Sequence, residues 1–160
     1  MLKKLLQFIA VAGALFSADI THAQTAAPPD AHLYIIWPQD GQRIKGAFWV
    51  RFGLRNMGVT RAGDAATNVG HHHLLVDVTG EINPDEPIPT DKKHMHFGGG
   101  QTEARLELPS GPHTLQLVLG DAEHRPFKPL VISKKIRIVV QCRNNNVADA
   151  RSPNGNRNSD

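Results

Sequence analysis

"LELPSGPHTLQLVLGD", at Leu106–Asp121, is the stretch that most clearly indicates how this chain folds. Polar and apolar residues alternate over Thr102–Leu108, which includes the first residues of this stretch. Leucines alternate with other residues across Leu115–Leu119. When every second residue is apolar, one face of the segment can pack against a core. This pattern is typical of β-strands. Between the two segments, Pro109–Pro112 combines proline, serine and glycine, which favour a turn. The stretch therefore predicts two strands joined by a tight turn.

Similar segments occur throughout residues 32–142, and none of them has a helical period. We predict further strands at residues 33–37, 47–54, 72–78 and 132–140, separated by Gly, Pro, Asn and Asp. The hairpin at residues 106–121 also resembles the penultimate hairpin of immunoglobulin-like domains. Together these segments predict an all-β fold, an immunoglobulin-like antiparallel β-sandwich of about seven strands, with a barrel as the alternative.

The N-terminal residues 1–23 have the pattern of a secretory signal peptide. Lys3 and Lys4 supply the positive start, Leu5–Phe16 is an apolar run, and Ala23 is the small residue at the expected cleavage point. The apolar run is too short for a spanning helix, although an uncleaved anchor is the alternative. We therefore predict a location in the periplasm or outside the cell, with no membrane span after cleavage.

The composition also suggests where the folded domain begins and ends. Residues 24–31 read QTAAPPDA and predict a flexible leader, and residues 143–160 are rich in asparagine and predict a disordered polar tail. The β-sandwich domain is predicted at residues 32–142.

Charge and cysteine content limit the classes of partner and the sources of stability that the domain can have. The chain has a formal net charge of +3, and removing residues 1–23 leaves 16 basic and 14 acidic residues. No run of Lys and Arg supplies the concentrated positive face that nucleic-acid binding needs, so no nucleic-acid partner is predicted. Cys142 is the only cysteine, and the domain therefore has no internal disulfide. Its stability must come from the core, or from the core together with a bound ion.

Nine histidines are the most unusual feature of the composition. Most of them lie in three motifs: GHHHLLVD at residues 70–77, HMHF at 94–97 and GDAEH at 120–124. If successive strands run antiparallel, the first two motifs lie at the starts of strands and the third follows the end of a strand, all at one end of the sandwich. His113 then lies at the opposite end. The convergence predicts a metal site, because imidazole is the commonest side-chain ligand of transition metals.

Strand geometry selects the candidate ligands. His71 and His73 point to the same side of a strand, and His94 and His96 have the same spacing. The predicted metal-site residues are His71, His73, His94, His96, His124 and Asp121. Asp121 is expected either to bind the metal ion itself or to orient an imidazole ligand. A histidine-dominated site favours copper or zinc over calcium or magnesium, which prefer oxygen.

Several of these motifs also have purely structural interpretations. His72 is expected to pack toward the core, Asp121 to stabilise a turn, and Gly98–Gly100 to form a flexible loop. Met57 and Met95 favour copper, since thioethers suit Cu(I), but methionine also fills gaps in cores.

The motifs GHHHLLVD, HMHFGGGQTE and GPHTLQLVLGDAEHRPF, in this order, resemble an exported bacterial domain of unknown function, the DUF4399 family. Ile88-Pro89, ahead of the second histidine motif, fits the same pattern. The resemblance covers about Leu33–Val140. It implies a free-standing, exported, single-domain protein, and it implies no activity.

Three functions fit these observations. The first is a periplasmic or secreted histidine-rich copper or zinc carrier or buffer, with the metal ion and a periplasmic protein as partners. The second is a metalloenzyme, but copper–zinc dismutases use a disulfide that Cys142 alone cannot form, and a histidine brace needs His where Gln24 is predicted to be first. The third is a metal-free binding module for a protein or glycan; Tyr34, Trp37 and Trp49 are its candidate aromatics, but their strand positions indicate core packing. No nucleophile–base pair predicts a hydrolase, and no reaction is assigned.

Overall fold

The computed structural model describes residues 24–142, and within them it confirms the all-β prediction. The strands are β1 (His32–Trp37), β2 (Arg43–Lys45), β3 (Phe48–Arg55), β4 (Gly58–Val59), β5 (Val69–Val76), β6 (His94–Phe97), β7 (Glu103–Leu106), β8 (Gly111–Gly120) and β9 (Ile136–Gln141). A search of the same residues finds no helix long and apolar enough to cross a membrane. The predicted signal peptide at 1–23 and polar tail at 143–160 lie outside the described residues.

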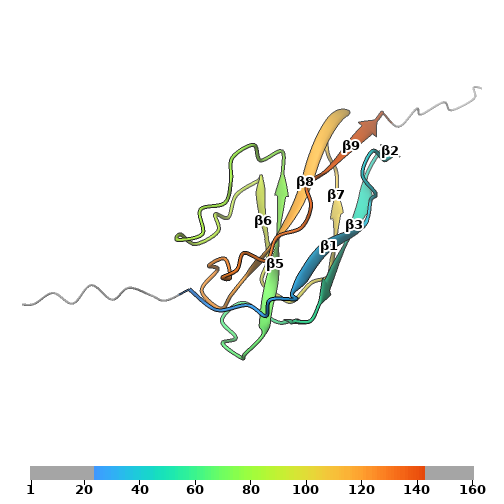
Figure 1. Ribbon diagram of the computed structural model, residues 1–160. Helices are drawn as coiled ribbons and strands as arrows, with labels where there is room; N and C mark the ends of the chain where they lie inside the picture. Colours follow the sequence, from blue (N-terminus) through green and yellow to red (C-terminus); the bar gives the residue numbers. More distant parts are fainter. Residues whose placement is uncertain (1–23, 143–160) are drawn as a thin grey trace, which may run out of the picture.

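The strands form two sheets, as the sandwich prediction requires (Figure 1). One has the order β1-β3-β7, and the other has the order β2-β9-β8-β5-β4 with β6 also paired to β5. Two sheets of mostly antiparallel strands are the architecture of a β-sandwich. Most pairings are antiparallel, but β2–β9 and β4–β5 are parallel. The sequence prediction of about seven strands missed β2 and β4, because three and two residues are too few to show a clear alternation, and it did not count the HMHF motif of β6 as a strand.

The main core lies between the two sheets. Strand β3 shows why it forms: Phe48, Val50 and Phe52 are buried, whereas the alternating Trp49 and Arg51 are exposed. From the other sheet, buried residues of β5, β8 and β9 face the same core. The expectation that Trp49 packs in the core is therefore wrong, since 48% of its surface is exposed. Trp37 is half-buried and packs against the core as expected.

Strand β5 is buried along nearly its whole length because both of its faces are covered. Leu74 and Val76 belong to the main core, whereas Leu75 belongs to a second cluster with Ile88 and Val118. The second cluster lies on the outer face of the six-stranded sheet. Residues 77–93 and 121–135 cover this face, and Figure 1 shows them on the side of the sheet away from β1 and β3. By alternation, His71 and His73 point to the same outer face as Leu75.

Residues 24–31 differ from the flexible leader that their composition predicts. The amide of Ala27 donates to the carbonyl of Lys128 at 3.0 Å, and the amide of Lys128 donates to the carbonyl of Thr25 at 2.9 Å. Ala27 and Ala31 also pack against the main core. The pairing with the 121–135 segment, which composition cannot show, is the physical reason for the difference.

Candidate metal centre

Three of the histidines are placed by strand pairing. On β5, His71 and His73 lie on the same face because they are two residues apart. On β6, His96 lies directly opposite His73 in the antiparallel register. On the other side of β5, Gly120 of β8 lies opposite His71. The sheet thus fixes three imidazoles next to one another on its covered outer face.

His124 joins these three residues from the loop that follows β8. Its backbone has a φ of 64°, in the left-handed region that few residues other than glycine adopt. The turn is held by Asp121, whose side-chain Oδ1 accepts hydrogen bonds from the amides of Glu123 and Arg125, both at 2.9 Å. Oδ2 of Asp121 accepts the hydroxyl of Thr25 at 2.6 Å. Asp121 therefore positions the loop that presents His124.

The four imidazoles form one compact cluster of His71, His73, His96 and His124. One ring nitrogen from each residue lies within 4.8 Å of the others. Nε2 of His71 is 3.1 Å from Nε2 of His73 and 3.2 Å from Nδ1 of His124. The ring of His96 lies 4.6 Å from that of His124, centroid to centroid. This arrangement is compatible with the binding of a metal ion.

Glycines leave room for the rings. A Cβ atom added at Gly120 would lie 2.9 Å from Nε2 of His73 and 3.4 Å from Nε2 of His71. One added at Gly98 would lie 2.6 Å from Nε2 of His96. Sequence reasoning assigned neither glycine to the site. A glycine at the end of a strand pattern, as at Gly120, does signal the close approach of another group.

Burial disfavours the charged form of three of the four imidazoles. His71 and His73 are fully buried, and His96 and His124 are half-buried. Desolvation, reinforced by repulsion from the neighbouring imidazoles, lowers the pKa of His71 to about 4 and that of His73 to about 3. The pKa of His96 is lowered by the same two effects, burial first and then the charge of His124. Neutral imidazole is the form that binds metal ions.

Two of the predicted site residues do not lie in the cluster. His94 lies opposite Leu75, two residues along β6 from His96, and its Nδ1 is 3.0 Å from a carboxylate oxygen of Asp91. The carboxylate of Asp121 is occupied by the hydrogen bonds that hold the turn, so its place fits the orienting role and not that of a ligand. Thr25, which contacts Asp121 from the N-terminal segment, was not predicted at all, because its sequence neighbourhood shows no motif.

The remaining motif residues pack elsewhere. His72 points to the opposite face of β5, where its ring lies 5.1 Å from that of Phe52 and its Nδ1 is 3.1 Å from the carbonyl oxygen of Gln101. Met57 and Met95 pack against the main core. The four-histidine cluster, as the structure describes it, therefore offers nitrogen ligands only.

The far end of the same strands holds a different histidine. Nδ1 of His113, at the start of β8, is 2.7 Å from a carboxylate oxygen of Asp77, and its Nε2 is 2.8 Å from the carbonyl oxygen of Pro109. Burial lowers the pKa of His113, but the hydrogen bonds to these two oxygens and the charge of Asp77 outweigh it and raise the pKa above its ordinary value. Both ring nitrogens face acceptors, which is the environment of an imidazolium.

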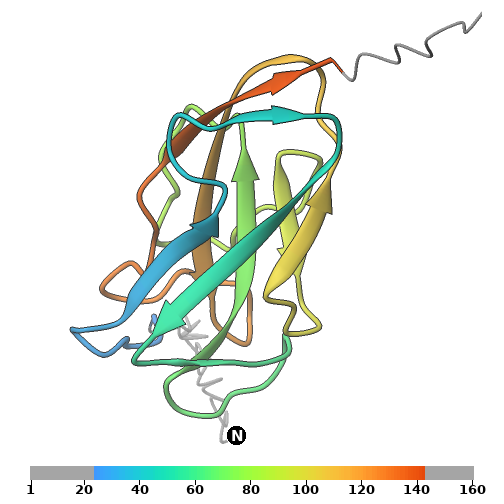
Figure 2. The same cartoon turned by 90° about the vertical axis from the view of Figure 1, so that its right-hand side faces the viewer.

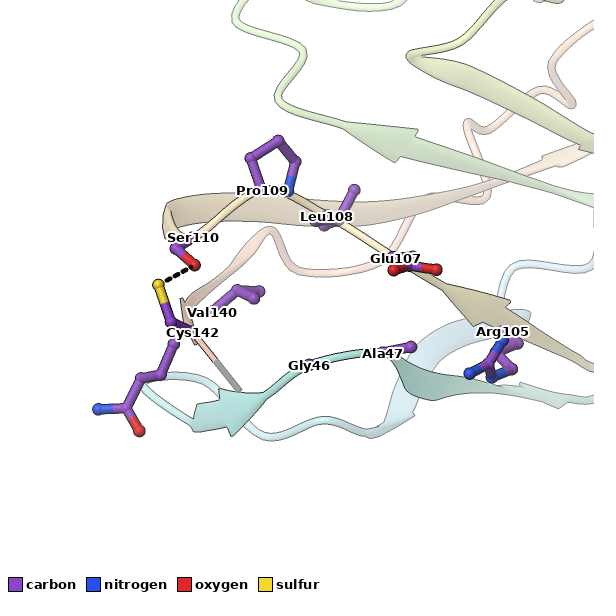
Figure 3. Close-up of a pocket in the computed structure, with 10 residues that line it drawn as sticks. Gly46, Ala47, Arg105, Glu107, Leu108, Pro109, Ser110, Val140 and Cys142 are labelled. Atoms are coloured by element: carbon purple, nitrogen blue, oxygen red, sulfur yellow. Dashed lines mark hydrogen bonds between the residues drawn. The ribbon is translucent and has the colours of Figure 1, made fainter. Parts of the chain in front are cut away.

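A hollow of about 330 Å³ also lies near this end, between β2, β9 and the turn before β8 (Figure 3). The thiol of Cys142 is 3.0 Å from the hydroxyl of Ser110 at its rim. Its lining contains no histidine among the described residues, so it contributes nothing to the candidate metal centre.

A family model described as "Domain of unknown function (DUF4399)" matches residues 50–141. The match spans β3 to β9 and includes all four histidines of the cluster. It begins later than the resemblance seen in the sequence motifs, which starts at Leu33. No curated protein and no solved structure matches the chain.

Proposed function

The chain belongs to the DUF4399 family, and on that premise we propose that it is an exported protein that binds one copper or zinc ion as a carrier or buffer. The ligands are His71, His73, His96 and His124. The family description names no activity, so the support comes from the chemistry of this cluster.

The observation that carries the proposal is the crowding around Nε2 of His71. An imidazole nitrogen has either one hydrogen or one lone pair in the ring plane, so it makes only one good hydrogen bond. Nε2 of His71 nevertheless lies within 3.2 Å of two other ring nitrogens. Nitrogens that ligate one ion converge in this way, and a tetrahedral site with metal–nitrogen bonds of about 2.0–2.1 Å holds them about 3.3 Å apart. The separations of 3.1 and 3.2 Å around Nε2 of His71 agree with that spacing, and the four ligand nitrogens all lie within 4.8 Å of one another.

The unsatisfied polar atoms support the same interpretation. Among the described residues, Nδ1 of His71, Nδ1 of His73 and Nε2 of His96 are buried without a hydrogen-bond partner, as is Nε2 of His72 outside the cluster. Buried polar atoms without partners are rare, and each costs about 1–3 kcal/mol. A histidine cluster that served only to stabilise the fold would be a poor solution, since apolar residues would fill the same space without this cost. A bound ion would offset this cost through its bonds to the converging nitrogens. The ligating atom of His71 and of His73 would be Nε2, so their Nδ1 atoms would stay without a partner.

The ligand set selects the class of metal. Four imidazoles, without a carboxylate, suit zinc and divalent copper and are poor ligands for calcium or magnesium. Met57 and Met95 pack against the main core, so thioether ligation of Cu(I) has no support from their positions. Four protein ligands also fill a tetrahedral site, whereas catalytic zinc sites keep one position open for water or substrate. This difference favours a carrier or buffer over a metalloenzyme.

A titration of metal-free protein, purified without a histidine tag, tests the proposal. We expect one equivalent of Zn²⁺ or Cu²⁺ to bind, and we expect the His71→Leu/His73→Leu variant to lose that binding. The matched control is His113→Gln, which removes a histidine from the far end of the same strand pair and leaves the stoichiometry at one. Stoichiometric binding retained in the double variant, or none in the wild-type chain, contradicts the proposal.

Export rests on the signal-peptide pattern of residues 1–23 and needs its own test. We expect the protein recovered from the periplasm or the medium to begin at Gln24. N-terminal sequencing of that material measures the cleavage point directly. Protein that stays in the cytoplasm with Met1–Ala23 attached contradicts export and leaves the metal-site proposal unaffected.

A further inference from the structure

The outer face of the three-stranded sheet carries the second notable group of side chains. Figure 2 shows this sheet, β1-β3-β7, toward the viewer. Trp49 on β3 is 48% exposed, which is unusual for the largest apolar side chain. Across the sheet, Arg105 of β7 lies directly opposite Trp49, and Arg51 follows two residues along β3 on the same face. An exposed indole is therefore flanked by two guanidinium groups.

The ring of Trp49 is free, in contrast to the other aromatic side chain on this face. Tyr34 lies against Gly53, stacks on the ring of His32 at 5.4 Å, and has the guanidinium carbon of Arg55 at 5.2 Å from its centroid. Among residues 24–142, no ring-stacking or cation–π partner is found for Trp49. The indole thus offers an open stacking surface, and Tyr34 does not.

The cations around Trp49 are Arg51, Arg105 and Lys45, and they outnumber the carboxylates of Glu103 and Glu107 on the same side. Arg51 pairs with Glu103 at 3.4 Å, in an exposed ion pair that is worth little in water. Of the described residues, no carboxylate lies within ion-pair distance of Arg105 or of Lys45, the nearby cation on β2. The surface around the indole is therefore complementary to an anion.

A hollow lies beside the indole. It has a volume of about 450 Å³, and its lining includes Trp37, Phe48 and Trp49, together with Lys45 and Arg51. This volume is within the range of small-molecule sites, which combine apolar walls with a few polar groups. The hollow is open to solvent, so a unit of a longer polymer can enter it from the sheet surface.

We propose that this face binds a carboxylated glycan, with one sugar ring against the indole of Trp49 and its carboxylate at Arg51, Lys45 or Arg105. The apolar C–H face of a sugar ring packs on an exposed indole, and guanidinium groups bind carboxylates through paired hydrogen bonds. A neutral glycan has no carboxylate to pair with the guanidinium and ammonium groups beside Trp49. A single-stranded nucleic acid needs several stacking platforms along a basic groove, and this face offers one free ring. The site lies on the other sheet from the histidine cluster, so it is independent of the metal proposal.

Binding of an oligogalacturonate to the full chain tests this inference, with a neutral glucan oligomer of the same length for comparison. We expect the carboxylated oligomer to bind and the neutral one to bind at least about tenfold more weakly. Trp49→Ala should weaken oligogalacturonate binding by about tenfold or more, and Arg105→Gln by about three- to fivefold. High salt should weaken it further, because the charges are exposed.

Matched variants keep the test specific. Leu130→Ala removes another exposed apolar side chain, and Arg137→Gln removes a cation on β9 of the other sheet; both should bind like the wild type. The His71→Leu/His73→Leu variant should also bind like the wild type. Equal binding of both oligomers, an acidic peptide or oligonucleotide that binds as tightly as oligogalacturonate, or an unchanged affinity in Trp49→Ala overturns the proposal.

Discussion

Strands β5 and β8 carry a histidine site at each end, and the two sites keep histidine in opposite states. At one end, both ring nitrogens of His113 face oxygen atoms, from Asp77 and Pro109, and the pKa of His113 is raised. At the other end, the four histidines of the cluster face one another, and the pKa values of His71 and His73 fall to about 4 and about 3. The surroundings of histidine thus favour protonation at one end, and at the other they favour the neutral form that can bind a metal ion.

Burial lowers the pKa of His71, His73 and His113 alike, and the oxygen acceptors around His113 are what reverse its effect there. The ring of His113 is well covered, with 10% of its side chain exposed, yet a carboxylate and a carbonyl oxygen favour its cationic form. The cluster contains no such acceptor: the nearest carboxylate in its loop, that of Asp121, is already bonded to Thr25 and to backbone amides. Buried imidazoles without oxygen acceptors favour the neutral form, which keeps a lone pair available for a metal ion.

The largest expected effect comes from removing one ligand of the cluster. His73→Leu should reduce the affinity for Zn²⁺ or Cu²⁺ by more than about 100-fold. Changing a residue that only orients a ligand costs about 10- to 100-fold, and losing a ligand should cost more. The metal-free variant should be as stable as the wild type or more stable by up to about 1 kcal/mol, because a buried nitrogen without a partner disappears. Metal titration and urea unfolding measure the two quantities. A metal-free variant that is several kcal/mol less stable would show that the histidines serve the fold itself.

A somewhat smaller effect should follow from loosening the loop that presents His124. Asp121→Ala removes the acceptor of two amides and of the Thr25 hydroxyl, so the left-handed turn at His124 loses its support. Metal affinity should fall by about 10- to 100-fold, as it does when residues that orient ligands are changed. Thr25→Val is the matched variant, since it removes only one of these bonds and should cost less. An unchanged affinity in Asp121→Ala would mean that His124 is not a ligand.

The residues of the cluster also show how much of the site could be predicted from the sequence. Alternation predicted that His71 and His73 share a face, and the end-to-end arrangement of strands predicted that the second and third motifs lie near them. The register between β5 and β6 could not be predicted, and it is the register that places His96 and not His94 opposite His73. The bonds of Thr25 to the 121–128 segment join residues about 100 positions apart and leave no local pattern.

The fold shows the same division between local and long-range information. About seven short strands separated by turn residues, with the alternation clear in β3 and β8, predicted a sandwich, with a barrel as the alternative. The exposure of Trp49 was missed because a position within a strand does not by itself tell which of the two faces a side chain is on. Short strands such as β4 exist only because a longer neighbour pairs with them.

The His113 end should respond to pH, and the cluster end serves as the comparison. His113→Gln should lower the free energy of unfolding by about 1–2 kcal/mol near pH 5.5, because bonds between His113 and the oxygens of Asp77 and Pro109 are lost. Since the pKa of His113 is raised in the folded state, its contribution is complete below the unfolded value of 6.5 and is lost as the pH rises through the folded pKa.

The carboxylate of Asp77 sets the acid limit of this effect. Burial raises the pKa of Asp77, but the bonds from His113 and the amide of Thr114 outweigh it and lower the pKa below 3.8, so its contribution is present above that value and is lost as the pH falls through the folded pKa. The difference between wild type and His113→Gln should therefore be largest between about pH 4 and 6.5 and shrink at higher pH. Urea unfolding across this range measures it. A difference that grows above pH 7 would contradict an imidazolium at this position.

The smallest expected effect separates the two histidines of β6. His94 lies opposite Leu75, with its ring beside Asp91, so His94→Ala should change metal affinity by less than about threefold, as substitutions away from a site usually do. His96→Ala, two residues away on the same face, should cost about 100-fold or more. If both variants lose affinity equally, metal binding must slide β6 along β5 by two residues, the smallest shift that keeps the same side chains on the same face. Metal titrations of the two variants, made side by side, therefore test the register of β6 as well as the identity of the ligand.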